Sequence, residues 1–228
     1  MTVSDGIAAT QEFYTRYAAL YDAIARHTPG AGSLRASVAD ALAPEPGDTV
    51  VEMGCGTGAN FPYLRERVGP TGTVVGVDFT PGVLAVARER IDEAGWENVH
   101  VVRGDATRPP VRDADAVLAT FVSGMLGDPA AAVRTWAGLV GPGGRLALAD
   151  LGRTTTTPFR PLNAMFKGIV RASSPPGTRS QLDRSPTEML DARLAAAHRQ
   201  LDDLCEDVQY ETRALGFARV TGGRVREE

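Results

Sequence analysis

The sequence contains very little lysine and cysteine, and it has no long apolar run. Lys167 is the only lysine, and the formal net charge of the 228 residues is −4, so no overall basic field would attract nucleic acid. The two cysteines, Cys55 and Cys205, lie far apart and form no CxxC or Cys/His ligand pattern. They predict no disulfide framework, and they favour a reducing, cytoplasmic location.

Secretion, membrane spanning and metal binding are also disfavoured. No apolar stretch approaches the roughly 20 residues that cross a bilayer as a helix. The first residues include Asp5 and Glu12 and contain no apolar leader, which predicts that there is no signal peptide. His27, His100 and His198 have no ligand-spaced partners, so no metal site is expected.

The middle of the chain alternates short apolar strands with helices. The expected strands cover residues 48–54, 73–79, 98–104, 115–121 and 145–151, and the helices between them cover 59–68, 81–94 and 129–140. This alternation predicts a doubly wound α/β fold, in which a mostly parallel sheet has helices on both faces. Ligands of such folds bind at the carboxyl ends of the strands.

Further elements are expected on both sides of this alternation. Helices at 9–26 and 33–43 precede it, and helices at 161–170 and 187–204 follow it. The last segment, 208–225, reads as two strands joined at Leu215-Gly216, an antiparallel hairpin that would complete a seven-stranded sheet. A single domain is expected, with four parts: 1–44 (N-terminal helices), 45–151 (cofactor-binding core), 152–205 (helical cap) and 206–228 (terminal hairpin).

The stretch VVEMGCGTGAN, residues 50–60, joins the first of the alternating strands to a helix. Its glycines, Gly54, Gly56 and Gly58, would let a ligand approach the backbone closely at a helix N-terminus. One interpretation is a dinucleotide fingerprint, with Asp78 about 20 residues further on for a ribose hydroxyl. The other is a site for the nucleoside of S-adenosylmethionine, which has no pyrophosphate to be cradled.

Three features favour the second interpretation. Glu52, at the strand tip, suits a cationic ammonium or sulfonium and would repel a pyrophosphate. Asp105 ends the third strand in RGDAT, where it could accept a hydrogen bond from an adenine amino group. The motif LVGPGGRLALAD follows the long helix at 129–140 and begins the fifth strand.

With these motifs in order over residues 45–151, the chain resembles the class I S-adenosylmethionine-dependent methyltransferases. The resemblance implies a Rossmann-like fold, S-adenosylmethionine as cofactor, S-adenosylhomocysteine as product, and methyl transfer by in-line displacement. By the same resemblance, Asp78 would bind the ribose hydroxyls, Phe79, Asp105 and Ala106 would meet the adenine, and Thr120 and Phe121 would face the methionine part or the substrate. The implied cofactor-binding residues are Glu52, Gly54, Cys55, Gly56, Thr57, Gly58, Asp78, Phe79, Asp105, Ala106, Thr120 and Phe121.

Within that superfamily the chain looks most like the quinone and phospholipid-headgroup methyltransferases. The signals are Tyr21-Asp22, the PLN…F segment after the fifth strand, and GFARVTGGR in the terminal hairpin. The resemblance implies a small, amphiphilic acceptor, although ATFVSGMLGD departs from the fourth motif of the quinone group. The candidate substrate contacts are Tyr17, Tyr21, Val122, Asp150 and Phe166, and no general base is identified.

Nucleic-acid and protein acceptors fit the sequence poorly. Superfamily members that methylate amino groups of DNA or protein often carry an Asn/Asp-Pro-Pro-aromatic tetrapeptide after the fourth strand, where this chain has TFVSG. A catalytic Pro-Cys is also absent, and no basic face is expected on the core.

The segment 153–182 contains five basic residues and no acid, although the whole chain is acidic. Within it, PLNAMFKGIV would place its apolar residues on one helical face. The segment could be a lid over the active site, a contact with a membrane surface, or part of a homodimer interface.

Three hypotheses follow from the sequence. The leading one is a methyltransferase that acts on a quinone precursor, a phospholipid headgroup or a similar amphiphile, with a soluble metabolite as the alternative acceptor. The second is an NAD(P)-dependent oxidoreductase. The third is a non-catalytic protein that keeps the cofactor fold as a binding or regulatory module.

Overall fold

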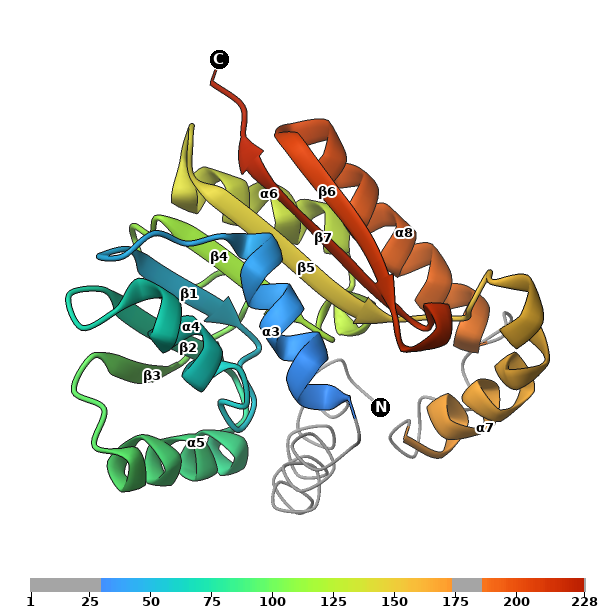
Figure 1. Ribbon diagram of the computed structural model, residues 1–228, viewed down its shortest axis with the longest axis horizontal. Helices are drawn as coiled ribbons and strands as arrows, with labels where there is room; N and C mark the ends of the chain where they lie inside the picture. Colours follow the sequence, from blue (N-terminus) through green and yellow to red (C-terminus); the bar gives the residue numbers. More distant parts are fainter. Residues whose placement is uncertain (1–29, 174–185, 228) are drawn as a thin grey trace.

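A seven-stranded sheet runs through the centre of the computed structural model, which describes residues 30–173 and 186–227 (Figure 1). The strand order is β3-β2-β1-β4-β5-β7-β6, with parallel pairing from β3 to β5 and antiparallel pairing of β7 with both β5 and β6. The strands are β1 (Thr49–Met53), β2 (Thr73–Asp78), β3 (Val99–Arg103), β4 (Ala116–Thr120), β5 (Arg145–Leu151), β6 (Cys205–Arg213) and β7 (Ala218–Val225).

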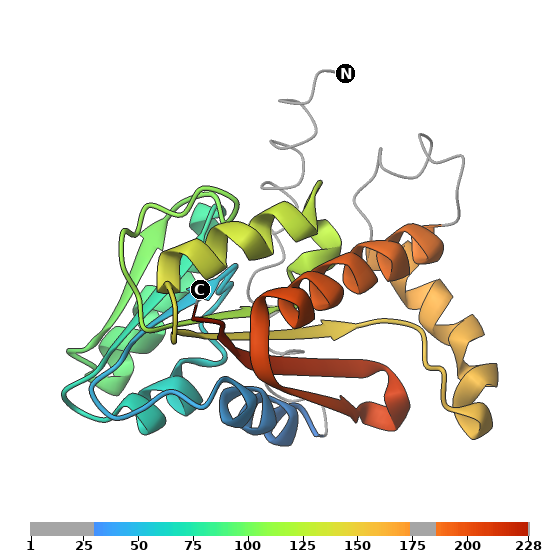
Figure 2. The same ribbon diagram turned by 90° about the horizontal axis from the view of Figure 1, so that it is seen from above.

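Helices cover both faces of the sheet (Figure 2). On one face α3, α4 and α5 pack against the strands, and on the other α6 and α8 do so. The α-helices are α3 (Ala31–Leu42), α4 (Phe61–Val68), α5 (Pro81–Ala94), α6 (Pro129–Val140), α7 (Asn163–Ser173) and α8 (Pro186–Leu204), and the short 3-10 turns are η1 (Ser123–Met125), η2 (Thr157–Leu162) and η4 (Ala214–Gly216). None of the described helices is long and apolar enough to span a bilayer.

The alternation of side chains along each strand decides which face a polar residue meets. In β1, Val50 belongs to the core on the α3–α5 face and Val51 to the core on the α6–α8 face. Glu52 is two residues after Val50 and therefore points toward α3 and α4. In β5, Leu148 belongs to the core on the α6–α8 face, so Asp150 points toward α8.

The predicted fold class is confirmed, including the terminal hairpin and the helical segment after β5. The hairpin begins at Cys205, three residues before the predicted start, directly where α8 ends. Where a helix is predicted at 161–170, the structure has η2 up to Leu162 and α7 from Asn163, and the Asn163 amide bonds to the backbone of Thr154 through both its oxygen and its nitrogen. The helix predicted at 9–26 lies outside the described residues.

Candidate functional site

The glycine loop between β1 and α4 leaves one part of its backbone open. Gly54, Gly56 and Gly58 all have left-handed φ angles, of 65°, 54° and 71°. A Cβ atom at Gly54 would lie 2.3 Å from Cγ2 of Val122, and one at Gly58 would lie 2.3 Å from Cε2 of Phe61. At Gly56, in contrast, a Cβ atom would meet nothing within 4 Å. The two outer glycines therefore allow close packing inside the protein, and Gly56 presents bare backbone to open space.

Asp78, at the tip of β2, holds this loop in place. Its Oδ2 accepts a hydrogen bond of 3.0 Å from the backbone nitrogen of Gly56, and its Oδ1 accepts one of 2.8 Å from that of Thr80. Burial raises the pKa of the Asp78 carboxyl, and the backbone donors partly oppose that shift. The side chain thus lies beside the open backbone of Gly56, where the sequence predicts a ribose contact.

Glu52 is buried at the tip of β1, with only 1% of its surface exposed. Its Oε1 accepts hydrogen bonds from Nδ2 of Asn60 at 2.5 Å and from Oγ1 of Thr120 at 3.2 Å. Its Oε2 has no hydrogen-bond partner in the described part of the chain. Burial raises the pKa of Glu52 to about 7, against the opposing effect of the Asn60 hydrogen bond.

Two residues that the sequence analysis did not select complete the surroundings of Glu52. Asn60 donates from Nδ2 to Glu52 and to Oγ1 of Thr120, the latter at 2.9 Å. Its Oδ1 accepts a hydrogen bond of 2.7 Å from Arg35 on α3. Asn60 could have been noticed as a polar residue between the glycines and the apolar start of α4, but nothing in the sequence links Arg35 to it.

The end of β4 closes over the glycine loop. Phe121 has a left-handed φ of 60°, which is uncommon for a residue with a large side chain, and its backbone nitrogen donates to the carbonyl oxygen of Ala149 at 2.7 Å. Val122 then packs against Gly54, as the Cβ distance above shows. Ser123 is buried, and its Oγ has no hydrogen-bond partner among the described residues. The end of β4 therefore packs directly against the glycine loop that follows β1.

The residues predicted to meet adenine lie at the ends of the neighbouring strands β2 and β3. The backbone nitrogen of Gly104 donates to the carbonyl oxygen of Asp78 at 3.0 Å, which joins the two strand ends. Asp105 lies two residues beyond β3 and is exposed, and its Oδ1 accepts 2.8 Å hydrogen bonds from the backbone nitrogen and the hydroxyl of Thr107. Ala106 is tied to α6 through its carbonyl oxygen, which accepts from Nε1 of Trp136 at 2.7 Å.

The comparisons with known proteins agree with this geometry. Residues 51–148 match the model of the methyltransferase domain family. Over these residues the chain is therefore similar to the methyltransferase domain family.

Two curated relatives illustrate the sequence similarity. Aklanonic acid methyltransferase DauC of Streptomyces sp. (strain C5) is 34% identical over 125 residues, which are 54% of this chain and 57% of that protein. Demethylmenaquinone methyltransferase of Listeria welshimeri is 30% identical over 127 residues, which are 54% of each chain. The chain thus spans about half the length of these relatives.

Solved structures extend the likeness to almost the whole chain. A putative S-adenosyl-L-methionine-dependent methyltransferase from Methanococcus maripaludis superposes with a TM-score of 0.63 at 17% identity, covering 94% of both chains. A putative O-methyltransferase from Nostoc punctiforme superposes with a TM-score of 0.64 at 17% identity, covering 92% of this chain and 60% of that one. At these identities the structures show a shared fold.

Cys55 packs its side chain inside the glycine loop, where its thiol lies 3.8 Å from the carbonyl oxygen of Gly56. Its thiol is buried toward Gly76 and Phe61, and burial raises the pKa of that thiol. The structure shows a packing role for the Cys55 side chain, and its contact with the cofactor stays a prediction.

Asp150 lies on the opposite face of the sheet from Glu52, beneath α8. It is buried, and its Oδ2 is 3.3 Å from Nε2 of His198, whose Nδ1 is 2.6 Å from Oγ1 of Thr221. The sequence analysis predicts a substrate contact for Asp150, and no observation tests that prediction. What the structure shows is His198 of α8 between Asp150 of β5 and Thr221 of β7, with a hydrogen bond to Thr221 and a close contact to Asp150 that is not a hydrogen bond.

Replacing His198 with alanine is expected to lower the free energy of unfolding by about 1–3 kcal/mol, because it removes the ring beside the buried Asp150 carboxyl and the hydrogen-bond partner of the buried Thr221 hydroxyl. Urea unfolding at pH 7 would measure the change. The control is Arg199→Ala, an exposed neighbour on α8, which should stay within about 0.5 kcal/mol of the parent protein. An equally small effect for His198→Ala would contradict the structural role of this pair.

The other predicted substrate contacts have different positions. Val122 follows β4 and packs against Gly54 of the glycine loop. The ring of Phe166 on α7 lies 5.4 Å from that of Phe217, next to the tip of the terminal hairpin. Tyr17 and Tyr21 lie outside the described residues.

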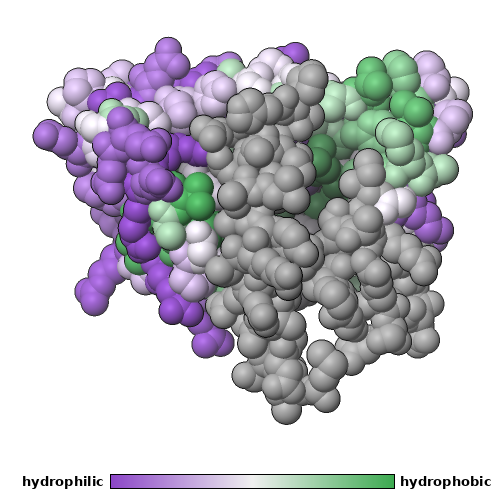
Figure 3. Space-filling view, turned by 90° about the horizontal axis from the view of Figure 1, so that it is seen from below, coloured by the Kyte–Doolittle hydropathy of each residue, from purple (hydrophilic) through white to green (hydrophobic). Residues whose placement is uncertain are grey.

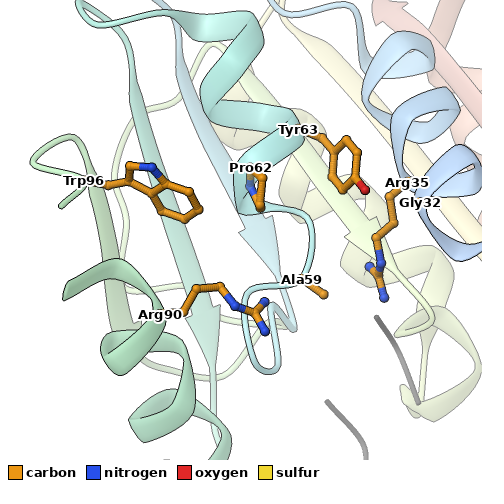
Figure 4. Close-up of a pocket in the computed structure, with 7 residues that line it drawn as sticks. All are labelled: Gly32, Arg35, Ala59, Pro62, Tyr63, Arg90 and Trp96. Atoms are coloured by element: carbon orange, nitrogen blue, oxygen red, sulfur yellow. The ribbon is translucent and has the colours of Figure 1, made fainter. Parts of the chain in front are cut away.

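A cavity of about 340 Å³ opens beside the glycine loop, between α3, α4 and α5 (Figure 4). Arg35 and Arg90 approach it from opposite sides, with Ala59 of the loop between them, and Tyr63 and Trp96 form further parts of its lining. The sequence analysis selected none of these residues. The cavity places two positive charges beside the glycine loop, which is hydrogen-bonded to Glu52 of β1 and to Asp78 of β2.

Proposed function

We propose that this protein transfers a methyl group from S-adenosylmethionine to a small, amphiphilic acceptor. The observation that carries the proposal is Glu52, whose Oε2 is buried without a hydrogen-bond partner in the described chain. A cationic ligand group would balance the negative charge of this carboxylate, whereas a pyrophosphate would be repelled by the carboxylates of Glu52 and Asp78. The site therefore favours S-adenosylmethionine over a nicotinamide dinucleotide.

The described residues fit this cofactor. The bare backbone of Gly56 allows close approach of a nucleoside, and Asp78 lies beside it at the tip of β2. Phe79 and Asp105 follow neighbouring strands at the same edge of the sheet, where they would hold the adenine. When bound, S-adenosylmethionine supplies an activated methyl group on a sulfonium sulfur.

The contribution of the protein is alignment and exclusion of water. Phe121 and Val122, at the end of β4, close one side of the site against the glycine loop. Glu52, held by Asn60 and Thr120, would orient the cationic end of the ligand. We assign no residue as a general base.

The acceptor class is proposed from the relatives and from the surface of this chain. The relatives are, by name, methyltransferases of aklanonic acid and of demethylmenaquinone. In this chain Met125 of η1, which follows β4, and Leu151 at the end of β5 are exposed apolar residues, which suits an acceptor with an apolar body.

The cofactor assignment predicts selective thermal stabilisation. S-adenosylhomocysteine at about 100 times its dissociation constant should add about 2.7 kcal/mol, and raise the melting temperature of a chain of this size by roughly 5 to 10 °C. NAD and NADP at the same concentrations should leave the melting temperature unchanged. Stabilisation by NAD alone would overturn the proposal in favour of an oxidoreductase.

The acceptor class can be tested by incubating the protein with methyl-labelled S-adenosylmethionine and a cell extract, followed by partition between organic and aqueous phases. Label in the organic phase is expected for an amphiphilic acceptor. Label in the aqueous phase alone would mean a soluble metabolite, and no transfer above a boiled-protein control would contradict enzymatic function.

A further inference from the structure

Exposed apolar side chains gather at one end of the molecule. Among the described residues seven large hydrophobic side chains are exposed: Val102, Met125, Leu151, Leu162, Met165, Tyr210 and Leu215. Four of them, Leu151, Leu162, Met165 and Leu215, belong to the end of β5, to η2 and α7, and to η4, and we call these four the apolar rim. Figure 3 shows hydrophobic residues concentrated at the side where Figure 1 places α7 and the hairpin tip.

The elements that carry this rim are close together because of the topology. Leu151 pairs with Ala218, the first residue of β7, and η4 immediately precedes that strand. Phe166 of α7 contacts Phe217 at the hairpin tip. The rim is therefore one surface, built from segments that are distant in the sequence.

The segment η2–α7 projects from the body of the protein with little packing of its own (Figures 1 and 2). No residue of η2 is buried, and Met165 of α7 is 60% exposed. The segment is nevertheless held in place, because Asn163 bonds twice to Thr154 and the Phe166 ring contacts the Phe217 ring in a tilted arrangement. A fixed segment that exposes a large apolar side chain indicates that something covers it.

The charge on the same segment indicates what covers it. Arg160 and Lys167 are exposed on η2 and α7, and residues 153–182 contain no acid. Arg153 is paired with Asp191 at 2.5 Å, but no acidic partner of Arg160 or Lys167 is found in residues 30–173 and 186–227. Basic side chains beside exposed apolar ones are typical of segments that lie in an anionic lipid interface.

We propose that the apolar rim, with Arg160 and Lys167, docks on an anionic lipid surface. A second copy of this chain is a poorer occupant, because a two-fold interface would bring the basic residues of both copies together. Docking here would place the ends of β4 and β5 next to the lipid, from which an amphiphilic acceptor could reach the methyltransferase site. The link to the acceptor rests on the proposed function, but docking itself does not.

The test is sedimentation of the purified protein with vesicles of phosphatidylcholine alone or with one quarter phosphatidylglycerol. Binding is expected only with phosphatidylglycerol, and it should weaken as salt screens the charges. Arg160→Glu with Lys167→Glu should lower the partition coefficient by about thirtyfold or more, since each basic residue near such a surface contributes roughly a factor of five. Met165→Asp should also lower it.

Matched control variants lie elsewhere on the protein. Val102→Asp changes an exposed apolar residue on β3, at the opposite edge of the sheet. Arg112→Glu with Arg226→Glu reverses two exposed charges, one shortly before β4 begins and the other just after β7 ends. Both controls should bind vesicles like the parent protein.

Three outcomes would overturn the proposal. They are absence of vesicle binding at low salt, binding that is equally strong with and without phosphatidylglycerol, and a fall in the partition coefficient that is as large for the control variants as for the rim variants. A dimer in light scattering that Met165→Asp dissociates would instead assign the rim to an interface between copies. Stabilisation by S-adenosylhomocysteine, measured on every variant, reports folding and the cofactor site separately from docking.

Discussion

Replacing Glu52 with glutamine is expected to stabilise the ligand-free protein at pH 8 by on the order of 3 kcal/mol. The pKa of Glu52 rises from 4.5 to about 7 on folding because the carboxyl is buried. The folded state therefore holds the proton more tightly, and this stabilising contribution is complete below pH 4.5 and is lost as pH rises through 7. Glutamine keeps an acceptor for Asn60 and Thr120 and carries no charge at any of these pH values.

The same variant is expected to lose cofactor affinity. If Oε2 of Glu52 compensates a cationic group, its removal should weaken binding of S-adenosylhomocysteine by roughly tenfold to a hundredfold, the usual range for a hydrogen bond to a charged group. A gain in stability together with a loss of binding is the signature of a functional carboxylate kept at a cost to the fold.

Two measurements check this prediction. Urea unfolding at pH 5 and pH 8 should show that Glu52→Gln differs from the parent protein mainly at pH 8, and calorimetry should show the weaker binding. Glu66→Gln, an exposed glutamate on α4, is the control and should change neither quantity. Unchanged affinity combined with lower stability at pH 8 would mean that Glu52 is only a structural residue.

Alanine substitutions in the glycine loop are expected to separate packing from ligand binding. At Gly58 a methyl group would collide with the buried ring of Phe61, 2.3 Å away, on a backbone with a φ of 71°. The left-handed conformation costs about 1–2 kcal/mol and the overpacking about 1–3 kcal/mol, so Gly58→Ala should lose about 3 kcal/mol or more. Gly56→Ala should lose only about 1–2 kcal/mol for the left-handed conformation, because its Cβ meets nothing within 4 Å.

Gly56→Ala is the substitution that should weaken ligand binding directly. The methyl group of Gly56→Ala would occupy the open face of the loop, so a folded and only mildly destabilised variant should bind S-adenosylhomocysteine at least about tenfold more weakly. Gly127→Ala, where a Cβ also meets nothing within 4 Å, is the control for both unfolding and calorimetry. Normal binding by Gly56→Ala would show that the ligand does not lie on this backbone.

The polar surroundings of Glu52 were only partly predictable. Its position at the end of a strand, shortly before the glycines, indicates a carboxylate at the carboxyl end of the sheet. The hydrogen bonds from Asn60 and Thr120 to Glu52, and from Arg35 to Asn60, depend on how the left-handed loop places Asn60 between the end of β4 and α3. Loop conformation and helix position come from the packing of the whole domain.

Asp150 shows a different limit. Its place at the end of a strand predicts a substrate contact, which no observation tests, and the side-chain alternation of β5 puts it on the same face as Leu148. Only the assembled fold shows that this face is covered by α8, and that His198 lies 3.3 Å away. His198 had no visible partner in the sequence because its neighbours come from β5 and β7.

By itself the sequence determined the strands and helices of the core, the doubly wound sheet with its terminal hairpin, and the location of the glycine loop. These features follow from apolar periodicity and turn residues, which act over short stretches of chain. The tertiary structure alone decided which oxygen of Glu52 is left without a partner, which face Asp150 meets, and which apolar residues of η2, α7 and η4 form one surface. Those outcomes depend on contacts between segments that are distant in the sequence, and such contacts exist only once the sheet and its covering helices have packed.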